Sequence, residues 1–215
     1  MCSSDLPLEN KHLTISKSCP SSISYHLISE TFIYEYPLEI NDLPTDTYIV
    51  TENTADEKVK VDGYRYNTTV YSPELGSASV TKGETAEVTV TNNYTKLVDV
   101  TVTKVLVDEF SSDVEFSFKA KLIESDTDIT EYLGTVSNEY YEFKLTPTGE
   151  TKTISTTFTG IPVGSELTVE EESNSDYTTT YKIGVAEFVA NEATLTIADG
   201  TNEITFTNTR KTVTV

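Results

Sequence analysis

The hydrophobic and polar positions of this chain alternate in short runs, most clearly on either side of Asn92-Asn93. Val88 and Val90 alternate with threonines before that pair, and valines alternate with polar residues over 98–102 after it. Period-2 alternation of β-branched residues is typical of a half-buried strand. The pattern predicts the last strand of one domain and the first strand of a second domain, joined by a short linker over 94–98.

The same alternation recurs along the 215 residues, and turn residues separate the runs. No window of ten or more residues has apolar positions at helical spacing. We therefore expect an all-β protein built as two tandem antiparallel β-sandwiches. The predicted strands cover residues 13–17, 30–36, 47–52, 64–71, 79–80, 86–91, 98–106, 114–122, 140–145, 152–158, 167–171, 176–183, 193–197 and 203–207.

Three pairs of segments indicate an internal repeat. Residues 88–96 resemble 204–211, residues 43–52 resemble 161–171, and residues 63–69 resemble 176–180. The repeat predicts one domain over 7–95, with a short and less regular start, and another over 96–213. The opening MCSSDL resembles a translated sequencing adapter, so we interpret residues 1–6 as an artefact and the chain as a fragment of a longer protein.

The charge and the cysteine content narrow the range of functions that the chain could have. The formal net charge of −20 is divided as −8 before Lys96 and −12 from Lys96 onward, which disfavours nucleic acid and anionic membranes as partners. Cys2 and Cys19 form no disulfide framework. No signal peptide or long apolar span is visible.

The sequence offers little for a catalytic or metal site. His12 and His26 make no metal spacing, and no cofactor motif is present, so an enzyme is the least favoured class. The acidic stretch 124–128 fits a solvated loop better than a Ca²⁺ site.

Polar residues end three apolar strand faces in the second domain. Continuing each alternation puts Lys104 on the face of the valines at 98–102, Glu171 on the face of Leu167 and Val169, and Asn208 on the face of Ile204 and Phe206. The first domain has the same order of residue types in Lys17, Glu52 and Asn92. An unpaired charge in a small core is unfavourable, so these placements need an explanation.

One explanation is amide formation between side chains. A lysine amine attacks the side-chain carbonyl of an asparagine, ammonia leaves, and an isopeptide bond joins the first strand to the last. Burial favours the neutral amine and the protonated carboxyl, so the glutamate can polarise the amide and carry protons. Alignment within the fold supplies effective molarities of about 10⁵ M or more. Alternatively, each lysine ends its strand in solvent, each asparagine opens a turn, and each glutamate lies on the surface.

The run 161–171 together with 204–210 resembles the Cna B-type repeat domains of Gram-positive surface proteins and pilins. The resemblance implies an inverse immunoglobulin-like sandwich in each half, with Lys–Asn isopeptide bonds promoted by a nearby acid. Carried over by position, the crosslinked pairs are Lys104–Asn208 and Lys17–Asn92, and the promoting acids are Glu171 and Glu52.

We therefore expect a stalk or spacer fragment of an extracellular protein attached to the cell wall. Its partners are neighbouring repeat domains of the same chain, and an LPxTG-type anchoring signal with a membrane tail is expected beyond Val215. No cofactor or metal is expected. The alternative is an adhesin module that binds a host matrix protein or a glycan through its loops, for which the pair Tyr140-Tyr141 is the candidate contact.

Overall fold

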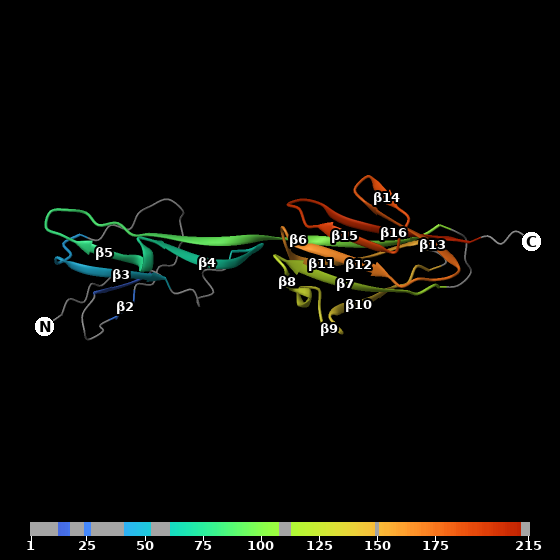
Figure 1. The fold of residues 1–215 in the computed structure, drawn as a ribbon, viewed down its shortest axis with the longest axis horizontal. Coiled ribbons are helices and arrows are strands. Elements are labelled where there is room, and N and C mark those ends of the chain that lie inside the picture. The colour runs from blue at the N-terminus through green and yellow to red at the C-terminus, as the bar shows by residue number, and fades with distance from the viewer. Residues whose placement is uncertain are drawn as a thin grey trace, which may run out of the picture. The chain divides into compact units, whose positions relative to one another are not determined.

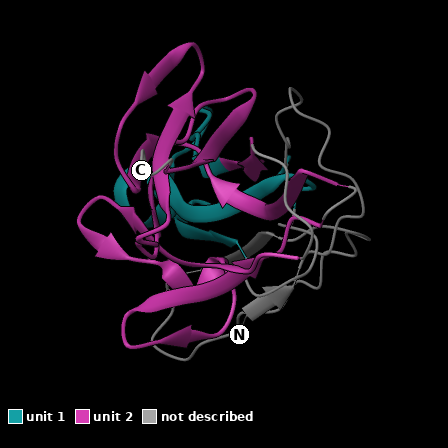
Figure 2. Ribbon diagram, turned by 90° about the vertical axis from the view of Figure 1, so that its right-hand side faces the viewer, with its two compact units in different colours: residues 1–95 teal, residues 96–215 magenta. Residues whose placement is uncertain are grey.

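The computed structural model describes residues 13–17, 24–26, 41–52, 61–107, 113–148 and 151–211, the first two ranges by their backbone alone. The predicted strand over 30–36, the proposed artefact at 1–6 and both cysteines lie outside these ranges. The chain forms two compact units, residues 1–95 and residues 96–215 (Figure 2). The fold is all-β, as the alternation predicts.

Unit 1 contains a four-stranded antiparallel sheet in the order β2-β1-β3-β5, and a separate strand, β4, which pairs with β6 (Figure 1). A short 3-10 turn, η2 (Glu74–Gly76), follows β4. The strands are β1 (Leu13–Lys17), β2 (Ser24–His26), β3 (Asp46–Glu52), β4 (Tyr64–Ser72), β5 (Ser77–Val80) and the first part of β6 (Thr89–Leu106).

Unit 2 consists of two sheets that pack around one apolar core. One sheet has the order β15-β12-β7-β10-β9, with β8 paired to β7, and the other has the order β11-β6-β16-β13-β14. The 3-10 turn η3 (Thr130–Tyr132) follows β8. The strands are β7 (Phe116–Glu124), β8 (Thr127–Asp128), β9 (Val136–Ser137), β10 (Tyr140–Leu145), β11 (Thr153–Pro162), β12 (Glu166–Glu171), β13 (Tyr177–Ile183), β14 (Ala186–Phe188), β15 (Glu192–Thr196) and β16 (Asn202–Arg210).

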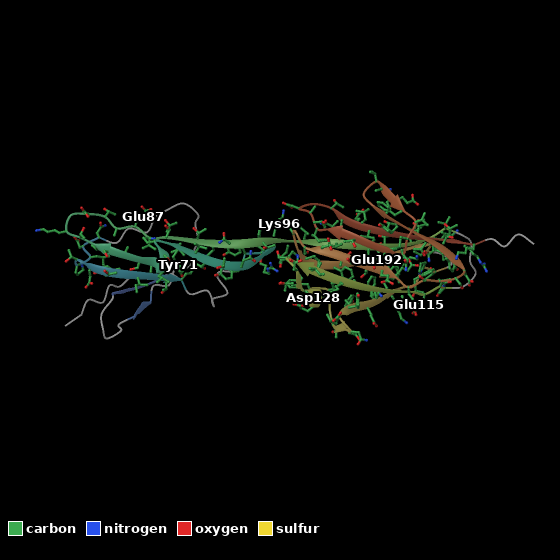
Figure 3. All side chains as sticks on the ribbon, viewed as in Figure 1. Tyr71, Glu87, Lys96, Glu115, Asp128 and Glu192 are labelled. Atoms are coloured by element: carbon green, nitrogen blue, oxygen red, sulfur yellow. The ribbon has the colours of Figure 1, made fainter. Side chains whose placement is uncertain are left out.

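The apolar and polar residues that alternate in the sequence correspond to inward and outward side chains in the strands. In β7 the residues from Phe116 to Leu122 are buried at every second position, and in β16 the same holds from Asn202 to Asn208. The inward faces of the two sheets supply the core, which contains Val102, Leu167 and Phe206 among others. Charged side chains such as Glu115 and Asp128 extend from the outer surface of this unit (Figure 3).

The predicted linker between the two domains is wrong in one detail, because it lies inside the strand β6. The expected linker over 94–98 is extended backbone inside a single strand that runs from Thr89 to Leu106. This segment contains residues of high strand propensity, namely Tyr94, Thr95 and Val98, so a strand is its favoured conformation. The acidic stretch 124–128, expected as a loop, contains the short strand β8.

The topology of unit 2 places its first and last strands side by side. β16 pairs with β6 in parallel, with Phe206 opposite Lys104 and Asn208 opposite Leu106. β11 pairs with the other edge of β6 in antiparallel register. The strand that carries Lys104 therefore has a neighbour on each side.

Candidate crosslinking site

Three polar side chains meet in the core of unit 2, and each is fully buried. Lys104 comes from β6, Asn208 from β16 and Glu171 from β12 in the facing sheet. The Lys104 Nζ donates to Glu171 Oε2 at 2.6 Å, and the Asn208 Nδ2 donates to Glu171 Oε1 at 2.6 Å. One carboxyl group therefore bridges the amine and the amide that the sequence analysis selected.

The environment of the amine is apolar. Its Nζ lies 4.2 Å from the centroid of the Phe116 ring and 5.9 Å from that of Phe118. Burial lowers the pKa of Lys104 to about 8, although the charge of Glu171 and its hydrogen bond act in the opposite direction. A lower pKa makes the neutral, nucleophilic form of the amine more accessible.

The amide of Asn208 is incompletely satisfied. Its Oδ1 has no hydrogen-bond partner, which singles it out among the buried side-chain atoms of the described residues. A buried acceptor without a donor is costly and is uncommon in native structures. The carbonyl that an isopeptide reaction would use is therefore not engaged by any other group.

The pKa of Lys104 predicts a pH dependence of stability in a chain that cannot crosslink. Asn208→Ala keeps the amine buried, so we expect its folded pKa to stay near the value of about 8 given by burial in this structure, below the unfolded value of about 10.4. The unfolded state then binds more protons across this window, so the free energy of unfolding rises with pH, by roughly 3 kcal/mol at most. Urea titrations from pH 7.5 to 10.5 measure it. The control is the double variant Lys104→Met/Asn208→Ala, and parallel pH curves for the two variants would contradict the prediction.

Unit 1 contains part of the same arrangement. The Asn92 Nδ2 donates to Glu52 Oε1 at 2.9 Å, and the Glu52 side chain is buried. This is the amide-to-carboxyl contact that Asn208 makes with Glu171 in unit 2. Glu52 and Asn92 are thus brought together as the sequence predicts.

Lys17 does not occupy the position of Lys104, which corrects the sequence prediction. In unit 2 the lysine strand β6 pairs with the asparagine strand β16, whereas β1 pairs with β3, the strand of Glu52. Leu13 is opposite Glu52 as Phe118 is opposite Glu171. Lys17 is opposite Tyr48 as Leu122 is opposite Leu167, so β1 is the counterpart of β7.

The sequence reasoning failed here because β1 and β6 have similar patterns. Both alternate apolar and polar residues and then reach a lysine, and the period of a strand does not reveal which neighbours it pairs with. Lys17 lies four positions along β1 from the residue opposite Glu52, which corresponds to about 13 Å of strand.

Other candidate residues have structural partners. Asp128 of the acidic stretch accepts hydrogen bonds from the Thr130 N–H and hydroxyl and pairs with Lys121. Within the described ranges, no group of three or more His, Cys, Asp or Glu side chains is placed to hold a metal ion. No helix in the described part of the chain is long and apolar enough to cross a membrane.

A family model described as "Domain of unknown function (DUF5979)" matches residues 29–95 and 100–211, which together exceed half of the chain. The chain belongs to the DUF5979 family. The two matched stretches fall on either side of the boundary between the two units, and the second contains Lys104, Glu171 and Asn208 of the DUF5979 chain. No curated protein sequence matches it.

Several solved structures are similar to this DUF5979 chain. The major pilin of Streptococcus pyogenes is 19% identical, with a TM-score of 0.40, over 87% of this chain and 75% of the pilin. The major pilin T-13 of the same organism is 16% identical, with a TM-score of 0.38, over 93% and 88%. The pilus-presented adhesin Spy0125 (Cpa) is 16% identical, with a TM-score of 0.37, over 52% of this chain and 26% of the adhesin chain. The DUF5979 chain thus spans about a quarter of that adhesin.

Proposed function

We propose that this chain is a load-bearing segment of an extracellular protein in which unit 2 is closed by an autocatalytic isopeptide bond between Lys104 and Asn208. The observation that carries the proposal is the fully buried triad in which Glu171 bridges the amine of Lys104 and the amide of Asn208. A structural ion pair needs no third residue, and an amide with an idle carbonyl oxygen adds cost without benefit to folding.

The contacts support a reaction in three steps. Lys104 transfers a proton to Glu171 Oε2, which converts the ion pair into a neutral pair without exchange with solvent. The lone pair of Nζ attacks Cγ of Asn208, the Nζ–Cγ bond forms, and the Cγ–Nδ2 bond breaks. Glu171 passes two protons in turn from Nζ to Nδ2, so the nitrogen leaves as ammonium and the carboxylate is regenerated. The buried site holds the amine and the amide in alignment, so the reaction needs no collision between separate molecules.

The strand order determines how the proposed bond would respond to a pulling force. β6 begins unit 2 and β16 ends it, and the two strands pair in parallel. A pull on the two ends of the unit would shear this pair. A bond between Lys104 and Asn208 would carry the load directly from one strand to the other and shield the residues between them.

This role fits a stalk or spacer at the bacterial cell surface. The resemblance of residues 161–171 and 204–210 to Cna B-type repeats of surface proteins and pilins supports it. The acidic, disulfide-poor composition supports it as well, because an isopeptide bond constrains a chain without oxidation. The partners would be neighbouring repeat domains of the same longer chain, and the location would be the cell wall.

The alternative function is that of an adhesin module that binds a host molecule, and the described residues give this alternative little support. Of the pair singled out from the sequence, Tyr141 packs against the core and contacts the rings of Phe143 and Phe158. Tyr140 accepts cation–π contacts from Lys119 and Lys121. The two tyrosines therefore serve different local contacts and form no joint aromatic patch.

Stretching the full chain by its two ends in a force-spectroscopy experiment tests the load-bearing function. The bond would enclose 208 − 104 = 104 residues, whose extended length is roughly 350 Å. We expect this extension to be missing from the wild-type trace and to appear as an unfolding step in Asn208→Ala. The same step in both chains would refute the proposal, whatever the two chains bind.

A further inference from the structure

The site of unit 1 holds a nucleophile of a different kind. The hydroxyl of Thr69 lies 2.6 Å from Asn92 Oδ1 and 3.1 Å from Glu52 Oε2. In unit 2 the corresponding carboxyl oxygen, Glu171 Oε2, accepts from the amine of Lys104. Thr69 thus contacts Glu52 as Lys104 contacts Glu171, and it also donates to the amide oxygen of Asn92, whereas the amide oxygen of Asn208 has no partner.

A break in the alternation of β4 turns Thr69 inward. Asn67 and Thr68 are both exposed, whereas Tyr66, Thr69 and Tyr71 are partly buried. Regular alternation of burial holds only from Thr68 to Ser72, and such a break in period resembles that of a β-bulge, which often re-aims a side chain next to a functional site.

Neighbouring hydroxyls hold the parts of the site in place. The Tyr66 hydroxyl lies 2.7 Å from Thr69 Oγ1, and the Tyr71 hydroxyl, whose residue is labelled in Figure 3, accepts the Glu52 N–H at 2.9 Å. The closed ring of contacts is completed by the Asn92 Nδ2, which donates to Glu52 Oε1 at 2.9 Å. The hydroxyl of Thr69, the amide group of Asn92 and the carboxyl group of Glu52 are each within hydrogen-bond distance of the other two.

We propose that unit 1 forms an ester crosslink between Thr69 and Asn92, promoted by Glu52. The Thr69 proton moves to Glu52 Oε2 and Oγ1 attacks Cγ of Asn92. The Oγ1–Cγ bond forms and the Cγ–Nδ2 bond breaks. Glu52 returns the proton through Oε1 to Nδ2, which leaves as ammonia. One alcohol and one amide give one ester and one ammonia, with no oxidant or cofactor.

The two oxygens of Glu52 suit this relay because each already contacts the group it must serve. Oε2 faces the hydroxyl that loses the proton, and Oε1 faces the nitrogen that gains it. A hydroxyl is a weak nucleophile without an adjacent base, and Glu52 supplies that base. The linkage would tie β4 to β6 within unit 1 and does not depend on the Lys104–Asn208 bond.

The test uses the full chain with Asn208→Ala, so that unit 2 cannot contribute. We expect its intact mass, in acid under denaturing conditions, to be short by one ammonia. Hydroxylamine, which cleaves esters and leaves side-chain amides intact, should free the Thr69 hydroxyl and leave a hydroxamate at residue 92, so that the deficit is replaced by a mass one oxygen atom above that of the sequence. A tandem mass spectrum of an acidic digest should show the peptides of Thr69 and Asn92 joined.

Two further variants in this background separate the ester from other losses of ammonia. Thr69→Ser keeps the hydroxyl and should keep the deficit, whereas Thr69→Val has a similar shape and should show the sequence mass. A deficit that persists in Thr69→Val would mean cyclisation of Asn92 with its own backbone and would overturn the proposal. The sequence mass in the Asn208→Ala chain itself, with Asn92 unmodified in the digest, would also overturn it.

Discussion

The Asn208→Ala variant is expected to lose about 5 kcal/mol of unfolding free energy in unit 2, because it cannot form the proposed Lys104–Asn208 bond, which would close a loop of about 100 residues in the unfolded chain. In a unit of about 120 residues such a loss lowers the thermal midpoint by roughly 20 °C. The truncation also removes the hydrogen bond to Glu171, which adds about 1–3 kcal/mol. Calorimetry of the full chain at pH 7 measures the change.

Asn202→Ala provides the matched control. Asn202 is also a buried asparagine of β16, and its side chain makes hydrogen bonds to Ala198 and Gly200. We expect this variant to lose stability through those hydrogen bonds and still to lack one ammonia in unit 2. If Asn208→Ala unfolds at the wild-type temperature, the Lys104–Asn208 bond does not contribute to the stability of the unit.

Glu171→Gln is expected to prevent the crosslink while keeping both reacting groups. Glutamine has nearly the same shape as glutamate, can accept from the Lys104 amine, and can pair with Asn208 once that amide is turned over. It cannot relay a proton, and loss of general acid–base catalysis slows such a reaction by about 10²–10⁴-fold. The purified variant should therefore retain the ammonia of Asn208, as its intact mass would reveal.

The neighbouring residue Glu170 is the control for this substitution. It lies on the same strand and pairs with Lys119 at the surface, so Glu170→Gln leaves the triad intact. We expect Glu170→Gln to crosslink like the wild-type chain. Complete crosslinking of Glu171→Gln in freshly purified protein would remove Glu171 from the mechanism and leave proximity alone as the cause of the reaction.

The unit 2 site was predictable because parity along a strand determines which face a side chain occupies. Lys104, Glu171 and Asn208 each continue an apolar face by one step, and all three are fully buried. Sequence parity could not reveal that one carboxyl group touches both other groups, because that contact depends on the packing of two sheets.

The unit 1 site was predictable only in part. Glu52 and Asn92 meet as expected, but the partner of a strand is determined by tertiary pairing, and β1 pairs where β7 does. The role of Thr69 is not predictable from strand parity for a related reason. The alternation of burial in β4 is broken at Asn67 and Thr68, so strict alternation does not indicate that the side chains of Thr69 and Tyr66 meet.

The most direct test of the central claim is the intact mass of the denatured full chain beside its Lys104→Arg variant. We expect the wild-type chain to lack one ammonia that Lys104→Arg retains, after correction for the substitution, and a digest to contain the peptides of Lys104 and Asn208 joined. Equal deficits in the two chains, with Lys104 and Asn208 recovered in separate unmodified peptides, would contradict the claim.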